Sequence, residues 1–212
     1  MAGNYFAAFD SETGGLNEKE ADLLTWYMAI LDEDYKILDE LYLKLKPDNN
    51  RLPVAEFGAL RVNGINLQKH MEDPETLTYS QGRAALTAMV KKYHKKVGKY
   101  NNIRPLGYNV PFDENWTFEH LMPKKEWLNL FHYKRIDVME RVDFLKEVGW
   151  FPQDIGSLNT VVDYLQLPKR AAHNCREDTL MTVDVYKKLL EIMKAKKENG
   201  GVQDLISILE AE

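Results

Sequence analysis

The chain has 212 residues, of which 44% are hydrophobic, and a formal net charge of −5. This length and composition suit one α/β domain with a single core. The sequence lacks a stretch long enough to span a membrane, a signal peptide and a second cysteine beside Cys175, so we expect a soluble cytoplasmic protein without an internal disulfide.

Apolar runs separated by turn residues predict the order of the elements. Two strands joined by the short acidic turn at 32–34 are expected to be antiparallel, and a helical region is expected over 79–97. The five strands that we predict span residues 5–10, 24–31, 36–45, 105–108 and 132–138. Early hairpin strands followed by strands that alternate with helices predict a mixed five-stranded sheet flanked by helices on both faces.

The segment FDSETGGL, residues 9–16, places two carboxylates at the end of the first strand. Residues two apart in a strand point to the same face, so Asp10 and Glu12 are expected to project side by side. Two acids directed at one point repel each other unless a cation lies between them. A DxE pair alone is weak support for a metal site, because such pairs also occur in solvated turns.

Two further acids follow in segments that an α/β fold can bring to the same edge. Asn109 ends a short apolar run, and Pro111 suits the first turn of a helix that also contains Asp113. Later, Asp178 falls early in a second helix. Its buried face is predicted from apolar residues at steps of three and four, namely Leu180, Val183, Tyr186, Leu190 and Met193. His173 is expected on the loop before this helix.

The order DxET, NxxxD and HxxxxD resembles the DEDDh class of 3′-to-5′ exonucleases, which includes the proofreading subunit of polymerase III, RNase T and oligoribonuclease. The segments ALRVNGI (59–65), RIDVM (135–139) and SLNTVVDYLQLP (157–168) support the resemblance. It implies a ribonuclease H-like fold. One departure is visible, since the family often has ETTGL where this chain has a glycine at position 14.

The resemblance implies a role for each matching residue. Asp10, Glu12, Asp113 and Asp178 match the metal-binding acids, and His173 matches the general base. Further candidates for substrate contact are Thr13, Leu16, Asn109 and Phe112. Trp116 and Phe118 also flank Asp113, but core packing is expected for at least two of these three aromatic residues. Asp137 is expected to support the structure, and Cys175 is not expected to act as a nucleophile.

The chemistry of the acids supports a metal site independently of the family. An oxygen-only set of ligands suits Mg²⁺ or Mn²⁺ better than zinc. Two such ions, about 3.5–4 Å apart, can activate a water and stabilise the leaving 3′ oxygen of a phosphodiester. His173 suits proton transfer from that water, because imidazole is the side chain that accepts and releases protons near neutral pH.

The net charge of −5 is unusual for an enzyme that acts on nucleic acid, but the four acids account for −4 of it. Two divalent ions at the site bring the total to −1, so affinity has to come from local positive patches and stacking. The candidate is KKYHKKVGKY, residues 91–100, which interleaves lysines with aromatic residues. The alternative is an ordinary solvated helix face that ends at Gly98.

We therefore predict a metal-dependent exonuclease that removes nucleoside 5′-monophosphates from the 3′ end of single-stranded DNA, in proofreading or DNA processing. One alternative is an exoribonuclease of the RNase T or oligoribonuclease type, and another is a non-catalytic module that binds nucleic acid or a polymerase. We assign residues 1–198 to the exonuclease domain and 199–212 to a short C-terminal tail. The expected partners are a single-stranded nucleic-acid 3′ end and either a polymerase or a second copy of the chain.

Overall fold

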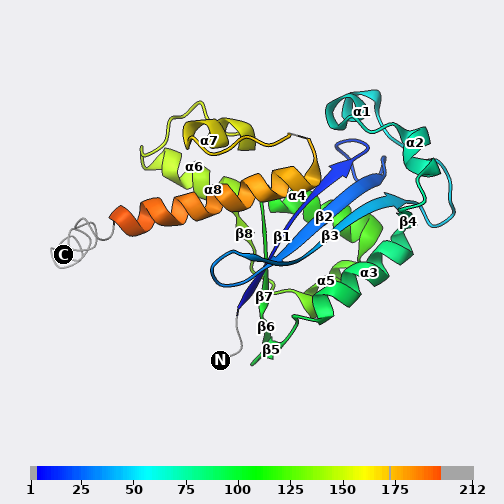
Figure 1. The fold of residues 1–212 in the computed structure, drawn as a ribbon, viewed down its shortest axis with the longest axis horizontal. Helices are drawn as coiled ribbons and strands as arrows, with labels where there is room; N and C mark the ends of the chain where they lie inside the picture. The colour runs from blue at the N-terminus through cyan, green and yellow to red at the C-terminus, as the bar shows by residue number, and fades with distance from the viewer. Residues whose placement is uncertain (1–3, 172, 197–212) are drawn as a thin grey trace.

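The computed structural model describes residues 4–171 and 173–196 (Figure 1). A central sheet lies between two groups of helices, as the sequence predicts for an α/β domain. The predicted tail at 199–212 lies outside the described residues.

The sheet has six strands in the order β4-β3-β2-β1-β7-β8. β2 is antiparallel to β1 and β3, whereas the pairs β1–β7, β7–β8 and β3–β4 are parallel. The strands are β1 (Tyr5–Thr13), β2 (Leu23–Leu31), β3 (Ile37–Lys46), β4 (Thr76–Thr78), β7 (Ile103–Gly107) and β8 (Ile136–Asp137). The predicted mixed sheet is confirmed, with the short strand β4 in addition. The strand expected over 132–138 is confined to two residues.

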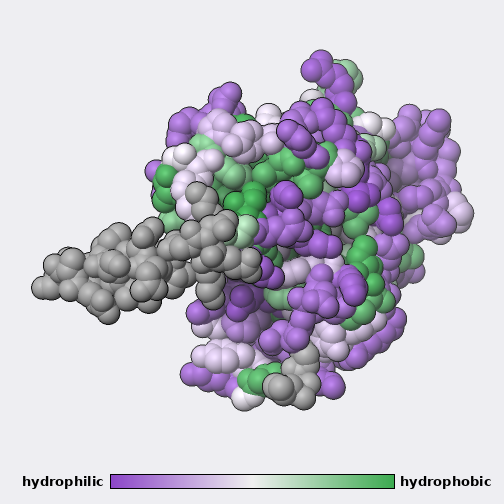
Figure 2. Space-filling model, turned by 60° about the vertical axis from the view of Figure 1, so that its left-hand side comes forward, coloured by the Kyte–Doolittle hydropathy of each residue, from purple (hydrophilic) through white to green (hydrophobic). Residues whose placement is uncertain are grey.

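Helices cover both faces of the sheet. The α-helices are α1 (Phe57–Asn63), α2 (Leu67–Glu72), α3 (Tyr79–Lys91), α4 (Val110–Trp116), α5 (Lys124–Leu130), α6 (Val138–Glu147), α7 (Leu158–Tyr164) and α8 (Cys175–Lys196), and a π-helical turn, η1 (Thr117–Leu121), follows α4. None of the helices within the described ranges is long and apolar enough to cross a membrane. Figure 2 shows a largely hydrophilic surface on one side of the molecule.

Alternation along β1 divides the core into two clusters. Phe9 packs with residues of α3, α4 and α5 on one face, including Trp116 and Trp127. Ala8 packs on the other face with residues of α6, α7 and α8, including Val185. All nine residues of β2 are buried, because helices cover both faces of this strand, and its sequence LLTWYMAIL is accordingly almost continuously apolar. The two clusters fix β1 at the centre of the molecule.

The predicted helix over 79–97 is too long, because α3 ends at Lys91. The chain then forms a hairpin of β5 (Lys96–Val97) and β6 (Tyr100–Asn101), with Gly98 in the turn at a φ of +64°. The Lys95 N–H donates to the Asn102 side chain at 2.6 Å, which draws the chain out of the helical path. The alternative of a solvated helix face ending at Gly98 is therefore wrong.

The buried stripe of α8 is displaced from the predicted one. Val183 is buried as expected, but Met193 is 44% exposed. The residues most fully buried in the middle of the helix are Met181, Val185 and Leu189, which recur at steps of four. Met193 instead lines a groove with Phe144 of α6 on the outer surface.

Candidate active site

The end of β1 brings the first two predicted acids onto one side of the sheet. β1 lies between β2 and β7, so its path is fixed by ladders on both edges. The register with β2 shifts between Glu12 and Thr13, where the strand leaves the ladder. Asp10 and Glu12 precede this irregularity and share a face, as the two-residue alternation predicts.

Asp178 joins these two acids from the first turn of α8. Ligand oxygens of Asp10, Glu12 and Asp178 all lie within 4.8 Å of one another. The three carboxylates come from segments about 170 residues apart, brought together because α8 packs across β1 and β2. The structure therefore places three of the four predicted metal-binding acids in one cluster.

The start of α8 is held by hydrogen bonds from the loop before it. The Asn174 side chain accepts from the Arg176 N–H at 3.1 Å, which satisfies a free amide of the first turn. The backbone N–H of His173 donates to a carboxylate oxygen of Asp178 at 3.1 Å. His173 is exposed and has a φ of +60°, so it lies on the loop, as predicted. The loop and the third acid thus form one unit.

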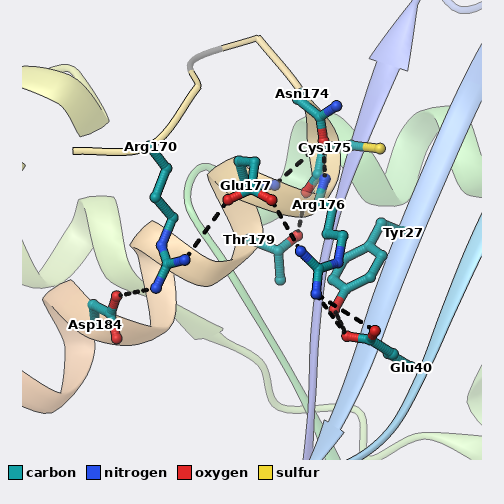
Figure 3. Close-up of polar contacts among 9 residues, drawn as sticks. All are labelled: Tyr27, Glu40, Arg170, Asn174, Cys175, Arg176, Glu177, Thr179 and Asp184. Atoms are coloured by element: carbon teal, nitrogen blue, oxygen red, sulfur yellow. Dashed lines mark hydrogen bonds and ion pairs between the residues drawn. The ribbon is translucent and has the colours of Figure 1, made fainter. Parts of the chain in front are cut away.

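Ion pairs fasten this loop and the start of α8 to the rest of the domain (Figure 3). Arg170 contacts Asp184 at 3.1 Å and Glu177 at 3.7 Å, which connects the loop to two turns of α8. Arg176 contacts Glu177 at 2.9 Å and Glu40 of β3 at 3.4 Å. Among these contacts, the pair of Arg176 with Glu40 joins the start of α8 to the sheet.

The fourth acid, Asp113, approaches from the opposite face of the sheet. It lies in the first turn of α4, is 3% exposed and accepts a hydrogen bond from the Ser11 hydroxyl at 2.6 Å. Ser11 lies between Asp10 and Glu12 in β1 and therefore points to the other face. Asp113 is outside the cluster of three, although its charge acts on both Asp10 and Glu12.

Asp137 fixes the start of α4. Its carboxylate accepts hydrogen bonds from the backbone N–H groups of Asn109, Val110 and Met139 at 2.9–3.0 Å. Asn109 has a left-handed φ of +62°, and Pro111 lies in the first turn of the helix. Asp137 therefore has the structural role predicted for it.

The acids at the site are held in an environment that disfavours their charged forms. Burial, together with the charges of Asp178 and Asp113, raises the pKa of Glu12 to about 8. Burial and the charges of Asp113, Glu12 and Asp178 raise the pKa of Asp10 well above its ordinary value. Burial also raises the pKa of Asp113, to about 7, against the opposing hydrogen bond from Ser11.

A divalent cation fits this set of residues. Within the described part of the chain, no lysine or arginine forms an ion pair with Asp10, Glu12, Asp113 or Asp178. The cluster offers carboxylate oxygens from three side chains and neither a thiolate nor an imidazole. Closely spaced oxygen donors are the ligands of hard divalent cations such as Mg²⁺ and Mn²⁺. A cation bound at this cluster would relieve the repulsion among the acids.

A hollow of about 490 Å³ adjoins the carboxylates and contains three of the four predicted substrate contacts. Leu16 is 84% exposed on its rim, and Phe112 forms part of its wall. Thr13 also lines it, but its hydroxyl donates to the Gly15 carbonyl at 2.7 Å within the turn. The fourth predicted contact, Asn109, is exposed at the start of α4 and is not among the residues that line the hollow.

Sequence reasoning missed the network that supports this hollow. The Asp22 side chain is 2% exposed and accepts from Arg51 at 2.5 and 3.0 Å, from the Val54 N–H at 2.6 Å and from Tyr79 at 3.1 Å. These bonds tie residues 51–54 to the segment that follows β1. No spacing rule links Asp22 to Arg51, so the sequence gives no signal for the pair.

A close approach of the backbone explains the glycine at position 14. A Cβ at this position would lie 2.5 Å from the Val54 carbonyl oxygen and 3.0 Å from Ala55. Gly14 also donates its N–H to the Asp22 carbonyl at 2.8 Å and accepts from the Glu56 N–H at 2.6 Å. The departure from ETTGL therefore accommodates the close passage of residues 54–56.

The aromatic and cysteine predictions agree with the structure. Trp116 is fully buried, and Phe118 packs against the same core cluster. Cys175 is buried, with its sulfur 3.4 Å from the Thr25 hydroxyl. Burial and the charge of Asp10 raise the pKa of this thiol, which makes it a poor nucleophile.

The sequence matches no protein-family model and no curated protein. Solved structures share the fold: exonuclease I of Escherichia coli in complex with a dT13 oligonucleotide has a TM-score of 0.70 and 18% identity, and covers 95% of this chain. A zinc-bound form of the same enzyme with single-stranded DNA also has a TM-score of 0.70, with 18% identity over 97% of this chain. Exonuclease I of Methylocaldum szegediense has a TM-score of 0.67 and 19% identity over 89% of this chain.

The alignments cover only 43%, 43% and 40% of those three chains, so this chain spans less than half the length of the enzymes it resembles. The expected α/β fold, with a mixed sheet flanked by helices, is confirmed by this likeness to exonuclease I over most of the chain. At this level of identity the similarity establishes the fold, and the function has to be argued from the site.

Proposed function

We propose that the chain is a metal-dependent 3′-to-5′ exonuclease that hydrolyses single-stranded DNA and releases nucleoside 5′-monophosphates. The observation that carries this proposal is the cluster of Asp10, Glu12 and Asp178, whose ligand oxygens lie within 4.8 Å of one another. Burial raises the pKa of all three acids, and no lysine or arginine of residues 4–171 and 173–196 forms an ion pair with them. Carboxylates that are crowded together without a neutralising side chain lower the stability of the fold, which favours a functional role for them.

Asp10, Glu12 and Asp178 are the residues that would hold a divalent ion, with Asp113 supplying a further carboxylate from the opposite face. We propose Mg²⁺ or Mn²⁺ as the ion, and two ions as the number. When bound, such ions neutralise phosphate charge, lower the pKa of water and stabilise a leaving oxygen. The Ser11 hydroxyl orients Asp113, and Asp137 orients the helix that carries it.

We assign His173 as the general base. It takes a proton from the attacking water, whose oxygen forms a bond to phosphorus as the bond from phosphorus to the 3′ oxygen breaks. The exposed loop position leaves its imidazole accessible, and the bond from its backbone N–H to Asp178 keeps it beside the cluster. An imidazole can accept a proton near neutral pH, which lysine and arginine do much less readily.

The terminal nucleotides are proposed to occupy the hollow beside Glu12. Leu16 on its rim and Phe112 in its wall offer apolar surface for stacking or wedging against bases. Thr13, with its hydroxyl held in the turn, contributes shape, and Asn109 contributes a polar group near Asp113. Exonuclease I has been solved with an oligonucleotide bound, which supports single-stranded DNA as the substrate class.

The test is degradation of 5′-labelled single-stranded DNA and RNA oligonucleotides of matched sequence, in Mg²⁺, Mn²⁺ or EDTA. We expect a ladder that shortens from the 3′ end in the presence of metal, and none with Asp10→Asn. Faster shortening of the DNA strand supports the proposed sugar preference, whereas faster shortening of the RNA strand favours the exoribonuclease alternative. Absence of cleavage in both strands contradicts the proposal.

A further inference from the structure

The far end of the sheet carries an aromatic and basic surface that the proposed active site does not use. In Figure 1, the β5–β6 hairpin lies at the end of the molecule where β1 begins, opposite the end to which β1 points. From Tyr5 to Asp10 and Glu12 the strand advances by five to seven residues, or about 17–23 Å. We define the distal surface as Lys96, Lys99, Tyr100, Arg104, His132, Tyr133 and Lys134.

Three aromatic rings form a cluster at the centre of the distal surface. The ring centroids of His132 and Tyr133 are 4.8 Å apart with nearly parallel planes, and Tyr100 lies 5.4 and 5.6 Å from them. Tyr100 is 40% exposed and Tyr133 is 59% exposed. Large aromatic faces left in water at one place offer stacking positions for flat apolar groups.

This ring cluster borders two hollows. One has a volume of about 270 Å³ and includes Arg104 and His132 in its wall, and the other has about 410 Å³ and includes Lys99 and Tyr133. Tyr100 and Asn101 line both hollows, and neither wall contains an acidic residue. Tyr100 is therefore in contact with the space of both hollows, where a flat group could lie.

Positive charge surrounds the rings. Lys99 lies 5.3 Å from the centroid of Tyr100, and Lys134 lies 5.9 Å from that of Tyr133. In the part of the chain that the structure describes, Lys96, Lys99, Arg104 and Lys134 form no ion pair. Burial and the charges of Arg104 and Lys134 lower the pKa of His132, which agrees with a positive local potential.

Hydrogen bonds hold the distal surface in place, although each strand of its hairpin has only two residues. The Asn101 side chain donates to the carbonyls of Leu128 and Phe131, both at 2.9 Å, and pairs with His94 at 3.0 Å. These bonds fasten β6 to the end of α5 and to the chain that precedes β5. A surface fixed before binding loses little conformational entropy on binding.

We propose that the distal surface is a second contact for single-stranded nucleic acid, in which bases stack on Tyr100 and Tyr133 and the cations track the phosphates. Exposed aromatic faces interleaved with unpaired cations are the combination that binds single strands without sequence preference. An acidic peptide matches the charge but has no flat groups for the two hollows. The binding of a single strand to the distal surface does not depend on the proposed function. The further statement that the same strand is the substrate of the carboxylate site rests on it.

Binding is measured by fluorescence anisotropy with 5′-labelled dT20 in EDTA, so that cleavage plays no part. Tyr100→Ala is expected to weaken binding at least about fivefold, and Tyr100→Phe to restore it, because stacking needs only the ring. Lys96→Ala with Lys99→Ala is expected to reduce the slope of log K against log salt by about 1.4. The matched controls Tyr164→Ala, 44% exposed on α7, and Lys194→Ala, exposed on α8, leave binding unchanged.

Turnover of a thymidine dinucleotide in Mn²⁺ separates this contact from the active site, because a dinucleotide in the carboxylate site is too short to reach Tyr100. We expect Tyr100→Ala to leave that turnover unchanged. The inference is overturned if Tyr100→Ala leaves dT20 binding unaltered, or if it lowers dinucleotide turnover as much as dT20 binding. It is also overturned if a deca-aspartate peptide binds with the same dependence on Tyr100. Tyr100-dependent binding in a protein that cleaves no strand supports the distal contact while contradicting the proposed function.

Discussion

Glu12 is a half-buried carboxylate and Asp22 a buried one ten residues later, and the fold surrounds them in opposite ways. Asp22 accepts hydrogen bonds from both terminal nitrogens of the Arg51 guanidinium, from a backbone N–H and from a tyrosine hydroxyl. Burial acts to raise its pKa, but the bonds from Arg51 and Val54 and the charge of Arg51 outweigh burial and hold the pKa below its ordinary value. Glu12 has other carboxylates as its charged neighbours, and its pKa is raised to about 8.

This difference distinguishes a structural acid from a functional one. The charge of Asp22 is balanced within the protein, so it stabilises the folded state. The charges at the end of β1 are not balanced, so they reduce stability until something from solution balances them. The two sites make opposite predictions for mutation, metal and pH.

The largest expected effect is on activity. Asp10→Asn removes one charge from the cluster and is expected to lower nucleotide release by at least about 10³-fold, because metal-based charge stabilisation is lost. The same variant should be as stable as the parent protein or more so in EDTA, since repulsion is relieved. Nucleotide release and thermal unfolding measure the two quantities, and a large fall in stability would place Asp10 with the structural acids.

His173→Ala is expected to lower turnover by about 10²–10⁴-fold, the usual contribution of a general base. Metal binding should persist, because the cluster of three acids does not include this imidazole. The measurement compares turnover with the Mn²⁺-dependent shift in unfolding temperature. Equal loss of both would make His173 a ligand or a structural residue.

Asp22→Asn is expected to reduce the free energy of unfolding by about 2–3 kcal/mol, because charged hydrogen bonds to a buried group are lost. For a domain of this size, the unfolding temperature falls by about 2–4 °C for each kcal/mol. Asp154→Asn, at an exposed position, is the control and should change little. An equal loss of stability in Asp22→Asn and Asp154→Asn would contradict the structural role of Asp22.

Mn²⁺ at one hundred times its dissociation constant is expected to stabilise the protein by about 2.7 kcal/mol. The gain should disappear in Asp10→Asn and remain in Asp22→Asn, because only the first variant alters the cluster. Differential scanning calorimetry in metal and in EDTA measures it. An equal gain in both variants contradicts a site at the end of β1.

The smallest expected effect concerns pH. Because the pKa of Asp22 is lower in the folded than in the unfolded protein, its contribution is present above its ordinary value of 3.8 and lost as the pH falls through the folded value. The stability gap between the parent protein and Asp22→Asn should therefore narrow from pH 7 to pH 3. Urea unfolding at both values tests this, and a gap that widens toward acid contradicts the assignment.

The sequence was sufficient where local rules decide the structure. Alternation placed Asp10 and Glu12 on one face, Pro111 placed Asp113 in the first turn of α4, and the spacing from Asp178 placed His173 on a loop. These features depend on a few neighbouring residues, so periodicity and capping preferences determine them.

Features that depend on distant contacts could not be predicted. The lysines after Lys91 would also suit a longer helix, so the sequence does not show where α3 ends. The end is set by the hydrogen bond from Lys95 to the Asn102 side chain and by the turn at Gly98. The buried stripe of α8 is decided by the sheet beneath it, and Asp22 by an arginine 29 residues away. Separation of Asp113 from the other acids follows from the path of α4 on the opposite face.

The close contact between Gly14 and residues 54–55 makes the conformation of each segment depend on the other. A side chain there would require residues 54–55 to move outward, and those residues carry the N–H that binds Asp22 and lead directly into α1, whose residues line the hollow. A side chain at position 14 therefore requires a different path for residues 54–56. Grafting the more usual ETTGL into this chain should succeed only if that segment is replaced with it.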